Sequence, residues 1–431
     1  MAKHHWIRCA LAAPIILGSA ALRAGTYNDV ARPFSFELFT ANVFPWIDGT
    51  KKGVVSDERG RMASGLKSLI ESADRGVEIA IYGVKQQKWF FDSLLRVKRK
   101  SGVSVHAVVD QHQGDVGDWN PENFDYPDTA QLAGLLGSGS VKPDTDKRGN
   151  TNVNSIMHNK FLVVDRSKLW FGSANISHTD AGSEYNANVA LLVKNPEIAR
   201  LYSDEFRQMY VDGRFSSGKF VREDQRPLRF SDGTIVEVFF SPQDDPMNRA
   251  ILEFIRRSRK TLDISMFFLT DTKAATALKD AVKRGVKVRL IYDALASAHA
   301  ASKHSWLRDQ GIDVRVENWG GKMHMKAAIA DRADVLMGSV NWSNAGSLKN
   351  DENTMVIRRN VDLAGAMSDY FDKLWTSLEP ASGDDRGRSG RGRPHQDPRA
   401  EGIESINSCD DGLDNDHDGL VDADDESCED L

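Results

Sequence analysis

The chain is poor in cysteine, with only three among 431 residues. Cys9 lies near the N-terminus, so the rest of the chain keeps only Cys409 and Cys428. These two flank one small acidic segment, and in an exported protein such a pair indicates a single disulfide. The body must therefore be held together by an ordinary core, which its 40% hydrophobic and 27% charged residues allow.

The chain also lacks an excess of positive charge, and its formal net charge is −6. The imbalance is local, because residues 404–431 contain twelve acidic side chains and no Lys or Arg. Without this tail and residues 1–24, the body is close to neutral. A near-neutral body neither requires nor excludes an anionic polymer as substrate, since binding one needs only a local basic patch.

The apolar run at the N-terminus, residues 9–22, is too short to span a bilayer comfortably. Basic residues precede it, and small residues follow at positions 19–21 and at Ala24. This order predicts a signal peptide over residues 1–24 and a secreted or periplasmic protein. A short uncleaved anchor is the alternative.

The body is an internal duplication. Strand-like runs at 77–82 and 262–267 are each followed by a basic helical stretch that ends at a glycine. A second β-rich run then ends in Asp, at 103–110 and 286–293. This alternation predicts an α/β fold with helices packed on mostly parallel or mixed sheets. The predicted division is a first lobe over 35–214, a connector over 215–235, a second lobe over 236–379, a linker over 380–403 and the tail 404–431.

The two copies differ in length at one place. From Asp110 to His158 there are 48 positions, but from Asp293 to His324 only 31. The extra residues fall in 111–154, which is rich in Gly, Asp, Asn and Pro. Because a long loop is usually functional or disordered, this insertion is a candidate for a rim that shapes the substrate site.

Each copy then carries His-x-Lys-x(4)-Asp, and after six intervening residues Gly-Ser-x-Asn. Residues two apart in a strand face the same side, so each His and Lys point together, and glycine lets the Ser-x-Asn segment return close by. A lone His-x-Lys means little, but two copies at identical spacing indicate a phosphate cage with a nucleophile and a proton donor. The residues concerned are His158, Lys160, Asp165, Ser173 and Asn175, and in the second copy His324, Lys326, Asp331, Ser339 and Asn341.

Both copies resemble the HKD motif of the phospholipase D superfamily, and the resemblance extends over residues 36–378. It implies two α/β lobes related by a pseudo-twofold axis, with one active site at their seam. It also implies a two-step displacement in which His158 attacks phosphorus and His324 protonates the leaving alcohol. Water or another alcohol then resolves the phosphohistidine.

The resemblance further implies supporting roles for the other motif residues. Both lysines and both asparagines would hold the phosphoryl oxygens, the serines would support them, and the aspartates would orient the site. The family often has a Glu eleven residues after the motif Asn, which orients the His. The second copy has Glu352 there, whereas the first copy has Asn186, with Glu184 two residues earlier. An amide stabilises an imidazolium less than a carboxylate does, so the two histidines are expected to have unequal roles.

No metal or cofactor is needed for this chemistry, because two ammonium groups occupy the place of a metal. The tail differs, since its carboxylates recur at calcium-loop spacing, between the two cysteines. A merely solvating acidic tail is the alternative. The predicted Ca²⁺ ligands are Asp414, Asp416, Asp418, Leu420, Asp422 and Asp425.

Three functions are compatible with the sequence. The favoured one is hydrolysis of a phospholipid headgroup, with transfer to an alcohol as a second outcome, because export gives access to membranes. The second is a secreted nuclease using the same chemistry. The third, a non-catalytic surface-binding protein, is opposed by the intact histidines. No protein partner is indicated. The nuclease alternative rests on a basic group made of Arg256, Arg257, Arg259, Lys260, Lys283, Arg284, Lys287 and Arg289.

Overall fold

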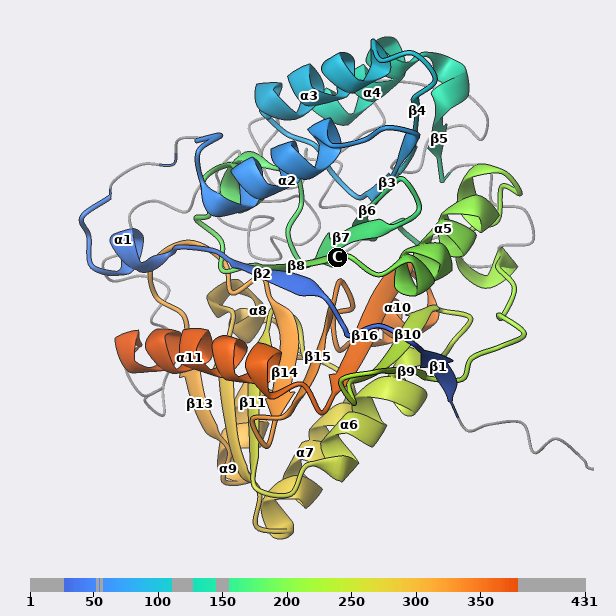
Figure 1. Cartoon of the computed structure of the whole chain (residues 1–431). Coiled ribbons are helices and arrows are strands. Elements are labelled where there is room, and N and C mark those ends of the chain that lie inside the picture. The colour runs from blue at the N-terminus through green and yellow to red at the C-terminus, as the bar shows by residue number, and fades with distance from the viewer. Residues whose placement is uncertain (1–26, 52–53, 55–56, 111–126, 145–154, 379–431) are drawn as a thin grey trace, which may run out of the picture.

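The computed structural model describes residues 27–51, 54, 57–110, 127–144 and 155–378. Two β-sheets with flanking helices fill this part of the chain (Figure 1). The predicted signal peptide, the linker 380–403, the calcium ligands of the tail and the cysteine pair lie outside the described residues. So does much of the insertion 111–154. These features stay predictions.

The first sheet has seven strands and forms lobe 1 with helices α1 to α5. Helix α2 shows why such helices pack on the sheet: Met62, Leu66 and Leu69 recur on one face and are buried. The strands in spatial order are β2 (Phe36–Thr40), β8 (Val189–Val193), β7 (Lys168–Gly172), β6 (Lys160–Val164), β3 (Gly76–Ile81), β4 (Ser104–Val109) and β5 (Val141–Pro143). The helices are α1 (Phe44–Ile47), α2 (Arg61–Glu71), α3 (Lys88–Lys98), α4 (Pro127–Leu136) and α5 (Pro196–Tyr210), with short turns η2 (Ser138–Ser140) and η3 (His178–Gly182).

The second sheet has nine strands and forms lobe 2 with helices α6 to α11. The strands in spatial order are β1 (Asn28–Val30), β9 (Leu228–Phe230), β10 (Ile235–Ser241), β16 (Glu352–Arg358), β15 (Asp334–Gly338), β14 (Lys326–Ala330), β11 (Thr261–Met266), β12 (Lys287–Tyr292) and β13 (Asp313–Val316). The helices are α6 (Leu252–Arg257), α7 (Thr272–Lys283), α8 (Ala294–Ala298), α9 (His304–Asp309), α10 (Asn344–Leu348) and α11 (Val361–Ser377), with short turns η4 (Ser216–Gly218) and η5 (Met247–Ile251).

The strand–helix–strand units predicted from the sequence are present in both lobes. In lobe 1, β3, α3 and β4 form one such unit, and the two strands pair in parallel. In lobe 2, β11, α7 and β12 form the other, again parallel. Strands β5 and β13 continue the parallel pairing beside β4 and β12, whereas on the other side β6 pairs antiparallel with β3 and β14 with β11. The sheets are therefore mixed, and the parallel pairing is confined mainly to one side of each.

Helices α5 and α11 each contact both lobes. The Tyr202 ring of α5 packs edge-on against Phe240 of β10, with centroids 5.1 Å apart. In α11, the Tyr370 hydroxyl donates to the Ala41 carbonyl in lobe 1, at 2.7 Å. Buried side chains from both lobes form one continuous hydrophobic cluster. The lobes are therefore joined by a shared core.

The predicted connector 215–235 is built into the fold. Strand β9 pairs with β1 from the start of the described chain, at the edge of the second sheet. Lys219 is completely buried, with its ammonium 2.5 Å from Glu205 Oε1 and 2.6 Å from Asp351 Oδ1. Although burial lowers the pKa of Lys219, the two carboxylates outweigh burial and raise it. This ion triad joins α5 of lobe 1 to the residue that precedes β16 in lobe 2.

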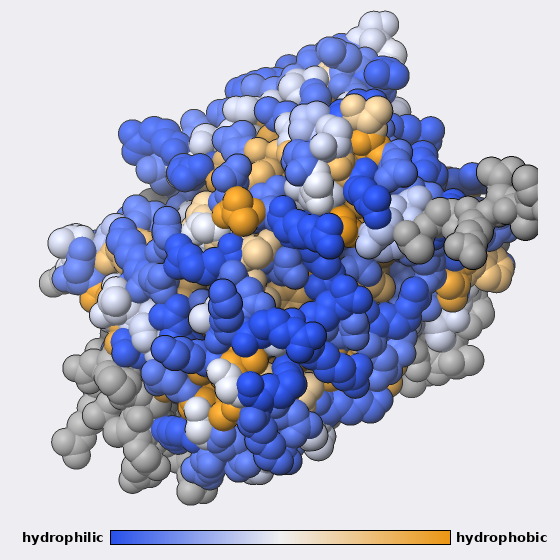
Figure 2. All heavy atoms as spheres, turned by 60° about the horizontal axis from the view of Figure 1, so that its bottom comes forward, coloured by the Kyte–Doolittle hydropathy of each residue, from blue (hydrophilic) through white to orange (hydrophobic). Residues whose placement is uncertain are grey.

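No helix of the described part is long and apolar enough to cross a membrane. Figure 2 shows one face of the molecule, on which hydrophilic side chains dominate and hydrophobic ones form small separate groups.

Candidate active site

The two motif histidines come directly before a central strand of each sheet. His158 precedes β6, which lies between β7 and β3, and His324 precedes β14, which lies between β15 and β11. Every residue of both strands is buried, as expected from their apolar sequences. Both histidines are 0% exposed. The sheets thus hold both imidazoles in a fixed position.

The glycines of the Gly-Ser-x-Asn segments allow the return that the sequence predicts. A Cβ on Gly172 would lie 2.1 Å from the Val189 carbonyl oxygen, and a Cβ on Gly338 would lie 2.1 Å from that of Asn353. No larger residue fits at either position without moving the next strand. Ser173 follows directly, and its hydroxyl donates to Asn188 Oδ1 at 2.7 Å.

His158 is oriented by a residue of the other lobe. Its Nδ1 lies 2.9 Å from Glu352 Oε2, and both side chains are buried. Its backbone N–H also donates to the Asp351 carbonyl at 3.0 Å. With Glu352 as a carboxylate, Nδ1 carries the proton and Nε2 is the nitrogen left for chemistry.

His324 shows the reverse pairing. Its Nδ1 lies 3.1 Å from Oδ1 of Asn188, the residue directly before β8 in lobe 1. Nearby, the Ala187 N–H donates to the Lys322 carbonyl at 2.7 Å, which holds the chain before His324 against lobe 1. Each histidine therefore depends on the opposite lobe, and both lie at the seam.

The partner of His324 is Asn188, and the sequence-based assignment to Asn186 is wrong by two residues. The strand registers show the equivalence, because the Ser173 N–H donates to Val189 O as Ser339 does to Asn353 O. Asn188 thus corresponds to Glu352. The first copy makes a wider π-helical turn over His178–Gly182, which adds two residues that identical spacing cannot anticipate.

Glu184, the other residue considered for this role, has a different function. Its carboxylate accepts the backbone N–H groups of Asn42 and Met62, each at 2.9 Å. The second bond lies in the first turn of α2, where backbone N–H groups lack helical partners. Glu184 therefore ties α2 to the chain before it and does not contact His324.

Asp180 is a site residue that the sequence did not reveal. It is 0% exposed, and its Oδ1 accepts from the side-chain amide of Asn188 at 2.6 Å and of Asn186 at 2.9 Å. Its Oδ2 accepts from the Asn175 N–H at 3.0 Å. The same Oδ1 lies 3.7 Å from His324 Nδ1. Because a carboxylate only accepts, it turns the Asn188 amide so that the carbonyl oxygen faces the histidine.

The motif lysines lie beside their histidines. Lys160 Nζ donates to the His158 carbonyl at 3.1 Å and lies 4.9 Å from the Tyr82 ring centroid. Lys326 repeats this arrangement, with Nζ 3.0 Å from the His324 carbonyl and 5.0 Å from the Phe267 ring. The aromatic rings thus hold each lysine and, by edge contact, each imidazole.

The motif aspartates lie away from the histidines, so their predicted role of orienting the site is wrong. Asp165 and Asp331 follow the far ends of β6 and β14, in two-residue turns with positive φ. The Asp165 carboxylate accepts backbone N–H groups of residues 74–76, and Asp331 accepts those of 259–261. Each Asp fixes the turn that leads into the neighbouring strand.

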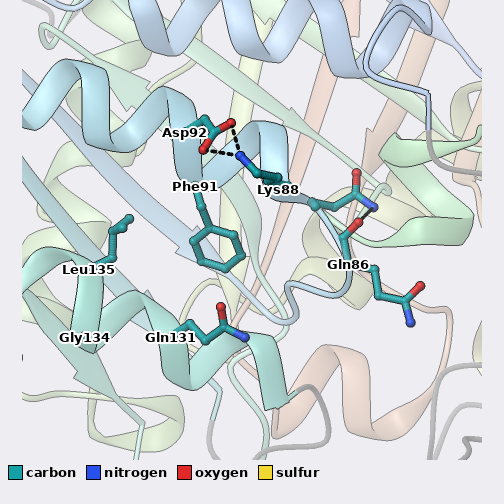
Figure 3. Close-up of a pocket in the computed structure, with 8 residues that line it drawn as sticks. Gln86, Lys88, Phe91, Asp92, Gln131, Gly134 and Leu135 are labelled. Atoms are coloured by element: carbon teal, nitrogen blue, oxygen red, sulfur yellow. Dashed lines mark hydrogen bonds and ion pairs between the residues drawn. The ribbon is translucent and has the colours of Figure 1, made fainter.

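A pocket of about 590 Å³ lies between α3 and α4, apart from the motif residues (Figure 3). Phe91 and Gln131 line it, and Lys88 pairs with Asp92 beside it at 2.7 Å. Helix α4 belongs to the insertion 111–154, so the insertion forms one wall of this pocket. Nowhere among the described residues are three His, Cys, Asp or Glu side chains grouped to hold a metal ion.

Comparison with known proteins agrees with this geometry. The family described as "Cardiolipin synthase, PLD-like domain" matches residues 66–210 and 251–375. A mitochondrial cardiolipin hydrolase of Xenopus tropicalis is 32% identical over 143 residues, covering 33% of this chain and 68% of the relative. A phospholipase D of Rickettsia prowazekii is 28% identical over 127 residues, covering 30% of this chain and 62% of the relative. Among solved structures, the phosphatidylserine synthase of Haemophilus influenzae aligns over 81% of this chain and 89% of its own, with a TM-score of 0.56 and 14% identity, which shows the fold alone.

Proposed function

Because the chain belongs to this PLD-like family of the phospholipase D superfamily, we propose that it hydrolyses phospholipids as a phospholipase D-type phosphodiesterase. The observation that carries the proposal is the crossed pairing at the seam. His158 is oriented by Glu352, and His324 by Asn188, so both imidazoles belong to one site. Two buried ammonium groups lie beside them, from Lys160 and Lys326.

Both rings are bonded at Nδ1, which leaves Nε2 of each for the reaction, and the assignment of His158 as nucleophile follows the resemblance to the superfamily. His158 Nε2 attacks phosphorus, the bond to the headgroup oxygen breaks, and His324 Nε2–H protonates that oxygen. Water then attacks the phosphohistidine and gives its proton to His324, and the bond to His158 breaks. Lys160 and Lys326 balance the charge on the phosphoryl oxygens, with Asn175 and Asn341 as further donors. An alcohol in place of water gives a transfer product.

Phospholipid is favoured over nucleic acid by the position of the basic group named in the sequence analysis. Backbone N–H groups of Arg259 and Lys260 bond Asp331, at the end of β14 opposite His324. Lys287 begins β12 at that same end of the sheet, where it pairs with the first residue of β11. A strand of this length separates the basic group from the histidines by roughly 20 Å. The names of the Xenopus and Rickettsia relatives also favour a lipid substrate.

The first test presents phosphatidylcholine, cardiolipin and single-stranded DNA in parallel to the purified full-length chain. We expect lipid cleavage with release of the headgroup alcohol, and no such cleavage by His158→Ala. Cleavage of DNA alone would support the nuclease alternative and overturn the lipid assignment.

The second test separates the two histidines with a p-nitrophenyl phosphodiester, whose leaving group needs no protonation. His324→Ala should give a stoichiometric burst of nitrophenolate and then a slow rate, because the phosphohistidine forms but water is not activated. His158→Ala should give no burst. The opposite pattern would exchange the two roles.

The place of action and the tail are proposals supported by sequence alone. A short apolar run after basic residues supports export to the periplasm or outside the cell. Carboxylates at calcium-loop spacing support Ca²⁺ binding by the tail, closed by Cys409 and Cys428. If calcium serves only the tail, EDTA should leave lipid turnover unchanged while a titration with Ca²⁺ shows one site.

A further inference from the structure

We propose that Lys322 recognises a second phosphate, carried by the alcohol that leaves during cleavage. The inference rests on the proposed function, and it names the class of phospholipid that the site prefers. Its basis is a buried cation in lobe 2 that the His-x-Lys motif does not include and that lobe 1 does not repeat.

The Lys322 ammonium is buried, and no described residue accepts a hydrogen bond from it. The residue is 4% exposed, and among the residues that the structure describes its Nζ has no hydrogen-bond partner. A buried cation without an acceptor is costly. The fold therefore holds this charge in place without satisfying it, which is expected of a group that an anionic ligand pairs.

The Lys322 ammonium lies beside an aromatic ring that also borders the active site. Its Nζ lies 5.5 Å from the centroid of the Phe267 ring. The same ring has Lys326 Nζ at 5.0 Å and the His324 ring in edge contact at 5.2 Å. One aromatic side chain thus has the motif lysine, the motif histidine and the additional lysine around it.

The backbone of Lys322 is clamped to lobe 1, which fixes where the side chain begins. Its N–H donates to Asn186 Oδ1 at 2.9 Å, and its carbonyl accepts from Ala187 at 2.7 Å. A Cβ on the preceding Gly321 would lie 2.3 Å from the Tyr185 carbonyl oxygen, so only glycine allows this approach. This rigid support is typical of a recognition residue.

The asymmetry between the lobes indicates which part of the substrate Lys322 contacts. Two residues before His158 the first copy has Ile156, where the second copy has Lys322 before His324. In an in-line displacement by His158, the leaving alcohol departs on the side of His324. Lys322 therefore faces the leaving headgroup, and a charge there selects a headgroup with its own phosphate.

Cardiolipin and phosphatidylglycerol form a matched pair of probes. Both leave through a glycerol oxygen, but only the alcohol from cardiolipin carries a second phosphate. Each would be presented at equal phosphodiester concentration in neutral detergent micelles. Lys322→Met should lower kcat/KM for cardiolipin by about 10- to 100-fold, the range of a charge-assisted hydrogen bond, and for phosphatidylglycerol by about 3-fold or less.

Two further variants complete the design. Lys322→Arg keeps the charge and should retain most of the preference for cardiolipin, and the exposed Lys287→Met should behave as wild type. Lys322→Met should unfold at the same temperature as wild type or higher, because it removes an unpaired buried charge. Equal losses on both lipids, or no loss on either, would overturn the assignment of Lys322 alone. Wild-type protein that cleaves neither lipid would overturn the proposed function together with it.

Discussion

The two halves of the candidate site share their reacting groups and differ in the side chains behind them. On one half, the Glu352 carboxylate contacts His158 directly at 2.9 Å. On the other half, the Asn188 amide contacts His324 at 3.1 Å, and the Asp180 carboxylate lies behind the amide. The duplication has thus kept the imidazole and ammonium of each copy while the surrounding layer has diverged.

This difference fits the two proposed roles. A ring that carries phosphorus becomes cationic, and a carboxylate at its other nitrogen stabilises that charge. A ring that gives a proton and takes it back must not hold the proton too firmly. On the side of His324 the Asn188 amide meets this need, and the Asp180 carboxylate lies one hydrogen bond further away. The following predictions test whether the two sides are as unequal as this argument requires.

The largest effect is expected from the ion triad, which supports only the Glu352 side. Lys219→Met leaves Glu205 and Asp351 buried without their shared cation. We expect the free energy of unfolding to fall by about 3–5 kcal/mol, measured by urea denaturation. The exposed Lys194→Met serves as the control. A loss below about 1 kcal/mol would show that the triad does not stabilise the join between the lobes.

Glu352→Gln makes the His158 side resemble the His324 side. The amide still accepts from Nδ1 but does not stabilise a cationic ring, so we expect kcat on phospholipid to fall about 100-fold or more. The nitrophenyl burst should slow in the same proportion, because formation of the phosphohistidine is the affected step. Glu37→Gln, at the exposed residue of β2, is the control. A kcat within about threefold of wild type would contradict the proposed roles.

The sequence was sufficient to predict the strands but not the contacts between the two lobes. Local apolar patterns predicted β3, β4, β11 and β12 to within about one residue, because a buried strand shows as a short run of apolar residues in the sequence. The pairing of His158 with Glu352 joins residues 194 positions apart and depends on how the lobes dock. Lys219 lies in a polar segment. It is buried by contacts with Glu205 and Asp351, which are distant from it in the sequence. Asn188 was missed because a π-helical turn shifts the register.

Asp165 tests a feature in which the two lobes agree. Burial raises the pKa of Asp165, but bonds from the backbone of Arg75, Gly76 and Asp74 outweigh it, so the pKa lies below its usual range. The stabilisation is then fully present above the unfolded-state pKa of about 4 and is lost as pH falls through the lower folded-state value. Asp165→Asn should cost about 1–2 kcal/mol near neutral pH and less at pH 3, with kcat unchanged. Asp331→Asn should lower the free energy of unfolding by a similar amount near neutral pH. A large drop in kcat for either variant would show that the aspartates do support catalysis.

The smallest effect is expected at Asp180, and it sharpens the comparison most. In Asp180→Asn an amide replaces the carboxylate that accepts from both Asn186 and Asn188. The Ser173 hydroxyl still bonds the Asn188 amide, but without the carboxylate the amide nitrogen can turn toward His324. That orientation favours the wrong tautomer of the ring. We expect the steady-state rate on the nitrophenyl ester to fall about 5- to 10-fold while the first turnover keeps its wild-type rate, because only the second step needs His324 to accept a proton. Equal losses in both phases would mean that Asp180 supports the fold around Asn175 and does not position His324.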